Sequence, residues 1–140
     1  MTESSSSQSK RIAGLIAYVL PGGWQVLAGR TDSDNDYLSI KLARGNDWWF
    51  HVRGMPGSHV VLRVPADGPE PEKETLKQAA AIAAFHSKAR GAGTVAVSCT
   101  QAKNVSKPRG AKPGTVSIHK EIVLKVRPAV DPAAPVGVRP

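Results

Sequence analysis

The sequence contains one cysteine, Cys99, which excludes a disulfide within the chain and a zinc site built from several cysteines. It has no run of about 18 apolar residues, so an ordinary transmembrane helix is excluded as well. The start of the chain is polar and rich in serine, unlike the apolar centre of a secretory signal peptide. These absences favour a cytoplasmic protein without a membrane partner.

Acidic residues are scarce in the last third of the chain. Residues 1–85 hold nine Lys or Arg and nine Asp or Glu, whereas residues 86–140 hold ten and two. The whole net charge of +8 therefore lies after residue 85. Such a segment favours a polyanionic partner, with nucleic acid as the first candidate, because charge placed only for solubility would not segregate in this way.

The chain has the length of one domain, with 140 residues of which 41% are apolar. We predict an α+β domain over residues 11–127, between a disordered tail at 1–10 and a Pro- and Ala-rich tail at 128–140. The domain is expected to hold a largely antiparallel sheet with one main helix, at about 73–90, packed on it. A short helix is expected near 35–43.

Strands are predicted from short β-prone segments bounded by turn formers. The segment 11–20 should pair with 24–28 around a Pro-Gly-Gly turn, and 94–100 forms a further strand. A closing hairpin is expected from 116–119 and 122–126.

Residues 47–64 are predicted to form two strands joined by a tight turn of type II, with Pro56 at its second position and Gly57 at its third. Side chains alternate across a strand, so one set on the first strand is apolar and faces the core. This set is Trp48, Phe50 and Val52. The opposite set is Trp49, His51 and Arg53. A core would need a buried partner for each polar head, whereas a surface for planar anions can use stacking, hydrogen bonding and charge.

A basic loop follows at residues 103–114, where two prolines and two glycines restrict the backbone. Its cations are Lys103, Lys107, Arg109 and Lys112. Preordered cations lose less entropy on binding than free ones, so the loop is a candidate for phosphate contacts. An ordinary solvated loop would explain the same residues. If it binds phosphates, we expect these cations to fold beside the tryptophan-bearing strands as one continuous surface.

A metal site or an acid–base site is one interpretation of Asp47, His51 and His59, because they lie close together across the predicted hairpin. A structural role for both histidines and a contact with RNA are the other two readings. The sequence carries no nucleophile elbow, phosphate-binding glycine loop or metalloprotease motif. We therefore expect a non-catalytic protein without a cofactor or metal ion.

Four motifs in order resemble the NFACT-R domain, found in larger proteins of ribosome-associated quality control. They are Gly29-Arg30 with Asn35-Asp36, Asp47-x-Trp49-Phe50-His51-x-Arg53-x-x-Pro56-Gly57-Ser58-His59-Val60, Thr75-Leu76-x-x-Ala79-Ala80, and Lys103-Asn104-Val105-x-Lys107-x-x-Gly110-Ala111-Lys112-Pro113-Gly114-x-Val116. The resemblance implies a module that binds RNA, tRNA or ribosomal RNA, with the large ribosomal subunit as a further partner and no preference for DNA. We expect a stand-alone domain, because a chain of this length has no room for the other domains of those proteins.

The expected RNA-binding residues combine the basic loop, the polar face of the central strand and the matching motif positions. They are Arg30, Trp49, His51, Arg53, His59, Lys103, Lys107, Arg109 and Lys112. Stacking on Trp49 and phosphate contacts from the loop are the main expectations. Two alternatives stay open, namely an RNA-processing enzyme using Asp47, His51 and His59, and a ribosome-docking protein acting through protein contacts.

Overall fold

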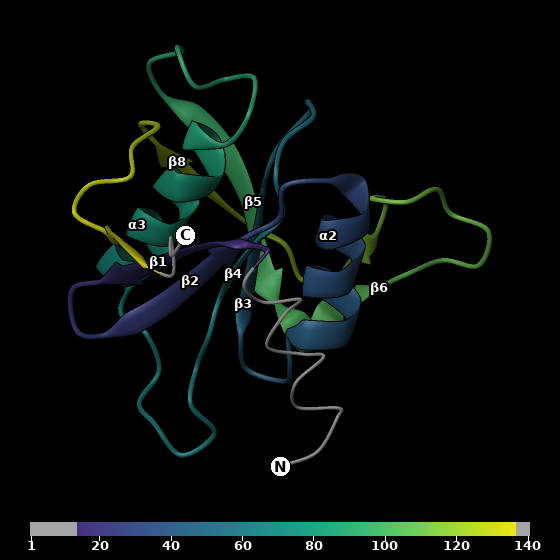
Figure 1. The fold of residues 1–140 in the computed structure, drawn as a ribbon, viewed down its shortest axis with the longest axis horizontal. Helices are drawn as coiled ribbons and strands as arrows, with labels where there is room; N and C mark the ends of the chain where they lie inside the picture. The colour runs from purple at the N-terminus through teal and green to yellow at the C-terminus, as the bar shows by residue number, and fades with distance from the viewer. Residues whose placement is uncertain (1–13, 137–140) are drawn as a thin grey trace.

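The computed structural model describes residues 14–136, which form an antiparallel seven-stranded sheet with helices on both faces (Figure 1). The strand order across the sheet is β8-β5-β3-β4-β2-β1-β9, and every neighbouring pair is antiparallel. The predicted α+β class with a largely antiparallel sheet is therefore confirmed. The strands are β1 (Ile16–Leu20), β2 (Trp24–Ala28), β3 (Trp48–Val52), β4 (Val60–Leu62), β5 (Val95–Gln101), β8 (Ile122–Val126) and β9 (Ala134–Val136).

The main helix, α3 (Lys73–Phe85), covers one face of the sheet (Figure 1). Its middle consists of alanines and Ile82, all buried, and small side chains let a helix approach a sheet closely. Phe50 and Val52 of β3 point into this core and Trp48 packs against it, which confirms the predicted apolar set. In the part of the chain that the structure describes, no helix has the length and hydrophobicity needed to cross a bilayer.

The helix ends at Phe85, five residues before the predicted end at Arg90. At His86 the backbone leaves the helical region, with φ −93° and ψ 41°. The segment that follows runs beside the turn after β3, where Gly57 and Ser87 form an isolated bridge. The expected boundary is wrong because tertiary pairing redirects the chain before Gly91 can end the helix.

A second, shorter helical segment lies on the other face of the sheet. It consists of α2 (Asp32–Asp36), continued by the π-helix η1 (Tyr37–Leu42). The helix begins three residues earlier than predicted, because the Thr31 side chain accepts a hydrogen bond from the Asp34 amide at 3.0 Å and caps it. Leu38 and Leu42 of η1 pack on the sheet and form a second core.

The turn between β3 and β4 spans seven residues and is not of the predicted type II, because Gly57 does not have the positive φ that this type requires. The left-handed residue is Gly54, with φ +76°. Gly57 serves close approach instead, since a Cβ there would lie 2.9 Å from the Cβ of Ser87. Gly57 therefore lets the turn pack against the segment that follows α3.

The predicted closing hairpin does not form. β7 (Ser117–Ile118) pairs with β6 (Val105–Ser106) in a separate two-stranded sheet, while β8 pairs with β5 in the main sheet. The 3-10 helix η2 (Ala102–Asn104) leads from β5 into β6. Because β6 and β7 pair with each other, the chain between them is held as a projecting loop (Figure 1).

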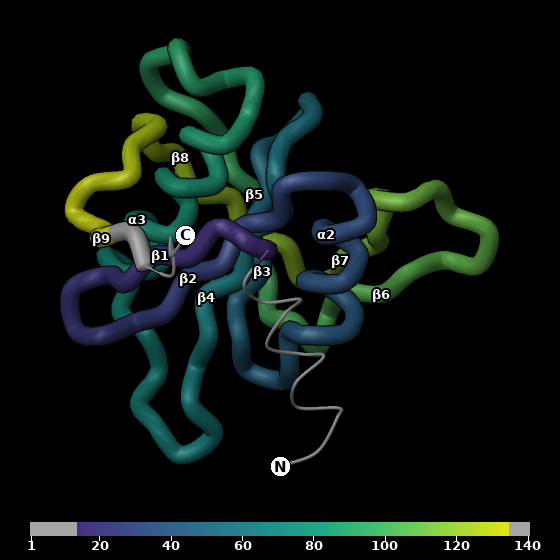
Figure 2. Tube along the Cα trace, in the orientation of Figure 1, coloured from purple at the N-terminus to yellow at the C-terminus, as the bar shows by residue number. Residues whose placement is uncertain are grey.

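The segment from residue 128 was expected to be a tail, and this is wrong as far as residue 136. β9 pairs with the outer edge of β1. Pro135 fits at this place because a proline is tolerated on an edge strand, where one side needs no N–H donor. Figure 2 shows the yellow segment that precedes β9 beside α3, where the Ala129 amide donates to the Ala81 carbonyl at 3.1 Å. The predicted tail at residues 1–10 and the last four residues lie outside the described residues.

Candidate nucleic-acid interface

The loop between β6 and β7 presents positive charge on a restricted backbone. Arg109 and Lys112 are exposed on it, and Lys103 is exposed on η2 just before it. Gly110 and Gly114 have φ of +79° and +86°, a region that favours glycine. Three of the four expected loop cations are therefore free of ion pairs among the described residues and point to solvent.

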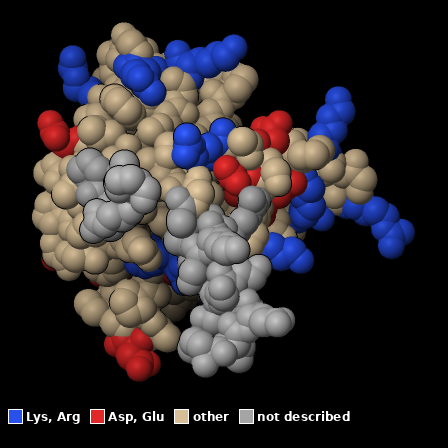
Figure 3. Space-filling model, in the orientation of Figure 1, with Lys and Arg blue, Asp and Glu red and all other residues tan. Residues whose placement is uncertain are grey.

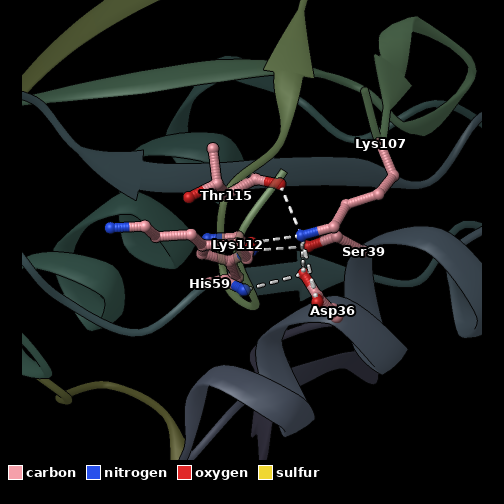
Figure 4. A network of polar contacts seen from close by, with 7 residues as sticks. Asp36, Ser39, His59, Lys107, Lys112 and Thr115 are labelled. Atoms are coloured by element: carbon pink, nitrogen blue, oxygen red, sulfur yellow. Dashed lines mark hydrogen bonds and ion pairs between the residues drawn. The ribbon is translucent and has the colours of Figure 1, made fainter. Parts of the chain in front are cut away.

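Lys107, the fourth cation, is bound within the protein (Figure 4). Its Nζ lies 3.1 Å from Oδ2 of Asp36 and donates to the carbonyl oxygens of Lys112 and of Thr115, the latter at 2.9 Å. Asp36 Oδ1 also accepts a hydrogen bond from the Gly114 amide at 2.9 Å. The expected phosphate contact of Lys107 is therefore wrong for this structure, because its ammonium holds the two ends of the loop together and to α2.

Trp49 lies in the second core, where its side chain is 4% exposed. It packs with Leu38, Leu42 and Val61, and its indole Nε1 donates to Ser39 Oγ at 2.8 Å. The prediction that Trp49 stacks on a base is wrong, because η1 covers the face of β3 that was expected to be a binding surface. The predicted alternation of side chains along β3 is correct, but each face of the strand packs into a core of its own.

His59 is also buried, at 3% exposed. Its Nδ1 lies 2.7 Å from Ser39 Oγ, and its amide donates to Asn35 Oδ1 at 3.0 Å. Because Ser39 already accepts the indole N–H, the hydroxyl can donate its own proton to Nδ1 of a neutral His59 ring. The expected RNA contact of His59 is wrong, and the structural reading of this histidine holds.

His51 lies half-buried between these groups and the surface. Its ring stacks on Trp49 at a centroid distance of 6.1 Å and meets the His59 ring edge-on at 5.2 Å. Burial lowers the pKa of His51, opposed by hydrogen bonding to backbone carbonyls. Burial, and then the neighbouring His51, lower the pKa of His59 to about 4. Both rings are thus held neutral near pH 7.

The stability of the domain should therefore fall in mildly acidic solution. In the unfolded chain a histidine binds a proton near pH 6.5, whereas folded His59 does so only near pH 4. Between these values the unfolded state holds more protons, so we expect the free energy of unfolding to drop by up to about 1.4 kcal/mol per pH unit as the pH decreases. Urea unfolding at several pH values from 7 to 4.5 measures this free energy. A His59 ring that titrates near pH 6.5 by NMR would contradict it.

Arg53 and Arg30 are exposed, but in different places. Arg53 Nε lies 3.3 Å from a carboxylate oxygen of Glu121, and this carboxylate also accepts a hydrogen bond from Ser98. Arg30 precedes α2 and forms no ion pair among the described residues. Arg53 is thus already partly neutralised, whereas the charge of Arg30 is available to a ligand.

Asp47 does not join the two histidines. It lies at the start of β3, four residues from His51, and strand geometry separates such positions by about 13 Å. Its carboxylate is 2% exposed and accepts hydrogen bonds from the amides of Arg44 and Val64, at 3.0 and 2.7 Å. The convergent site that the enzyme alternative required is absent. Over residues 14–136 no cluster of three metal-ligating side chains is found.

Figure 3 shows Lys and Arg side chains over the projecting loop, over the loops at the top and near the centre of the same face. Acidic side chains lie between the central cations and the projecting loop, in the region of α2, whose sequence carries Asp32, Asp34 and Asp36. The expected continuous surface of loop cations and the tryptophan-bearing strands does not form, because η1 covers the face of β3 that carries Trp49. Sequence reasoning also missed Asp36 as the anchor of the loop, although Asp36 stands in a motif that was noted.

The sequence and the fold were compared with known proteins. The family model described as "NFACT protein RNA binding domain" matches residues 16–120. The Rqc2 homolog RqcH of Bacillus subtilis is 38% identical over 117 residues, which are 84% of this chain and 20% of that protein. The Rqc2 homolog RqcH of Streptococcus suis is 40% identical over 106 residues, which are 76% of this chain and 19% of that protein.

A solved structure shares the fold. The C-terminal part of the fibronectin/fibrinogen-binding protein from Streptococcus suis superposes with a TM-score of 0.76 and 37% identity. The match covers 84% of this chain and 46% of that one. The chain thus spans about one fifth of the length of the RqcH relatives and about half of this solved structure.

Proposed function

Because the chain belongs to the family of NFACT protein RNA-binding domains, we propose that it binds tRNA or ribosomal RNA through the β6–β7 loop. The proposed setting is ribosome-associated quality control in the cytoplasm, since the relatives are Rqc2 homologs. The role proposed is that of a binding module without catalysis. The chain matches one fifth of those relatives, so their further activities are not assigned to it.

One observation supports the proposal most strongly. The loop holds Arg109 and Lys112 exposed on a backbone that Lys107 and Asp36 fix in place. Cations on a fixed backbone lose less conformational entropy when they meet phosphates, and each contact releases counterions. Exposed Lys103 adjoins the loop on η2 and extends the surface.

Replacing Arg109 and Lys112 by alanine should lower the affinity for RNA about tenfold or more at low salt, because two phosphate contacts are lost. The slope of log K against log salt should become shallower by about 0.7–0.9 for each contact. Fluorescence anisotropy with labelled tRNA and with ribosomal RNA fragments, at several salt concentrations, measures both quantities and ranks the two RNAs.

A matched control removes the same charge from the opposite face of the sheet. Lys73 and Lys77 are exposed on α3, so their double alanine variant should bind RNA nearly as the wild type does. Equal losses in both variants would point to net charge alone and contradict a loop-centred site. Ribosome association that ignores salt would instead favour docking through protein contacts.

A further inference from the structure

A pocket outside the loop collects cations from two segments far apart in the sequence. Arg30 lines it from the loop before α2, and Lys88 and Arg90 line it from the segment after α3. The turn at Pro56, Gly57 and Ser58 forms a further wall. The pocket is open to solvent and has a volume of about 390 Å³, within the range of about 300–1,000 Å³ typical of small-ligand sites.

Ser58 ties the walls of this pocket together. Its amide donates to the His86 carbonyl at 3.0 Å, and its hydroxyl donates to the Gly29 carbonyl at 2.6 Å. The close approach of Gly57 to Ser87 adds a third contact between the turn and the segment after α3. The backbones that carry the cations are therefore fixed relative to one another before any ligand arrives.

The cations are exposed and their charges are not used within the described part of the protein. Arg30, Lys88 and Arg90 form no ion pair there. Arg90 is nevertheless held in place, because its Nε donates to the Phe85 carbonyl at 2.7 Å and its guanidinium lies 4.1 Å from the centre of the Phe85 ring. Its two terminal amino groups remain for a ligand.

Two further titratable groups face the pocket. Asp32 lines it and leaves the net charge of the lining positive. His86 pairs with the Tyr18 hydroxyl at 2.8 Å, and burial, followed by the nearby Arg90, lowers its pKa. The positive charge of the pocket therefore comes from its three basic side chains.

We propose that this pocket binds a phosphate group of RNA, as a second contact separate from the β6–β7 loop; this inference rests on the proposed function. Guanidinium groups match the oxygen geometry of phosphate, and an ammonium adds charge. The acidic stretch of α2 lies between the pocket and the loop, with Asp32 lining the pocket and Asp36 holding the loop. The two contacts are thus separate binding sites for one RNA.

The first test uses inorganic phosphate and the complete chain, so it does not depend on RNA binding. In a ¹⁵N-resolved NMR titration, phosphate should shift the amide signals of Arg30, Ser58, Lys88 and Arg90, whereas chloride at the same ionic strength should not. These shifts should vanish in R30A/K88A, whose altered side chains are exposed and make no ion pair within residues 14–136. Equal shifts with chloride, shifts confined to the loop, or shifts that persist in the variant would overturn the proposal.

The second test measures RNA affinity with the same variant. R30A/K88A should bind a single-stranded RNA oligonucleotide about fivefold more weakly, as loss of one charge-assisted phosphate contact predicts. If the wild type binds an oligonucleotide with a 5′-phosphate more tightly than one with a 5′-hydroxyl, and the variant does not, the pocket binds a terminal phosphate. If the variant loses the same affinity for both oligonucleotides, the pocket binds an internal phosphodiester. Wild-type affinity in the variant would refute the pocket and leave the loop proposal intact. If the wild type binds no RNA, the proposed function fails, and the phosphate titration still decides the pocket.

Discussion

Replacement of Trp49 by alanine is expected to lower the free energy of unfolding by about 3–5 kcal/mol, the range for removing a large aromatic side chain from a core. The indole is buried in the second core, and its loss would open a cavity beneath η1. The same change leaves Ser39 without its indole donor. Because small domains have a free energy of unfolding of about 5–15 kcal/mol, this variant should be unfolded at modest urea concentrations. Urea titration followed by circular dichroism measures the change.

Two further variants separate burial from other causes. Trp49→Phe keeps one aromatic ring in the core and loses the pyrrole part of the indole with its hydrogen bond to Ser39, so the loss of stability should be smaller, at about 1–3 kcal/mol. Met55→Ala alters an exposed side chain, 37% accessible, and should change stability by less than about 0.5 kcal/mol. A Trp49→Ala protein of unchanged stability that binds RNA poorly would restore the stacking hypothesis.

The alternation along β3 could be predicted from the sequence, because local geometry alone decides which side chains share a face. Phe50 and Val52 do enter the core under α3. What covers the opposite face could not be predicted in this way. Ser39, the polar partner of Trp49, is on η1, and burying an indole there depends on how that helix packs.

The basic loop shows the same division between local and long-range information. Its position, glycines and exposed cations follow from residues 103–114 themselves. The role of Lys107 does not, because its partner Asp36 is 71 residues away and a cation that is paired looks the same in sequence as one that is free. The hairpin wrongly predicted after Val116 failed for this reason too, since β7 pairs back with β6.

The cationic pocket could not be predicted from the sequence, because two of its basic residues had another explanation. The helix predicted at about 73–90 would place Lys88 and Arg90 in its last turn, where positive charge complements the helix dipole. The helix ends at Phe85, so these residues instead follow it and meet Arg30 across the turn at Gly57. A shift of five residues in one boundary thus changes the role of two side chains.

Asp47→Ala is expected to cost about 3–5 kcal/mol of stability, because a buried carboxylate with several partners is removed. The amides of Arg44 and Val64 would lose their acceptor inside the protein. The carboxylate also lies 3.1 Å from Arg63 Nε, although that N–H is not aimed at it and the contact is an ion pair without a hydrogen bond. Its removal would leave the partly buried Arg63 without this ion pair.

Asp47→Asn tests whether the carboxylate is structural or catalytic. The amide side chain keeps one oxygen acceptor and nearly the same shape, so the variant should stay folded and lose less, about 1–3 kcal/mol. At a temperature where both proteins are folded, its affinity for RNA should match that of the wild type, because the Asp47 carboxylate is buried and its partners, the amides of Arg44 and Val64 and Nε of Arg63, are not among the proposed RNA-binding groups. An RNA-cleaving activity in the wild type that Asp47→Asn abolishes would establish the enzyme alternative. The three partners of the Asp47 carboxylate already account for its burial, so a catalytic role is not needed to explain why it lies inside the protein.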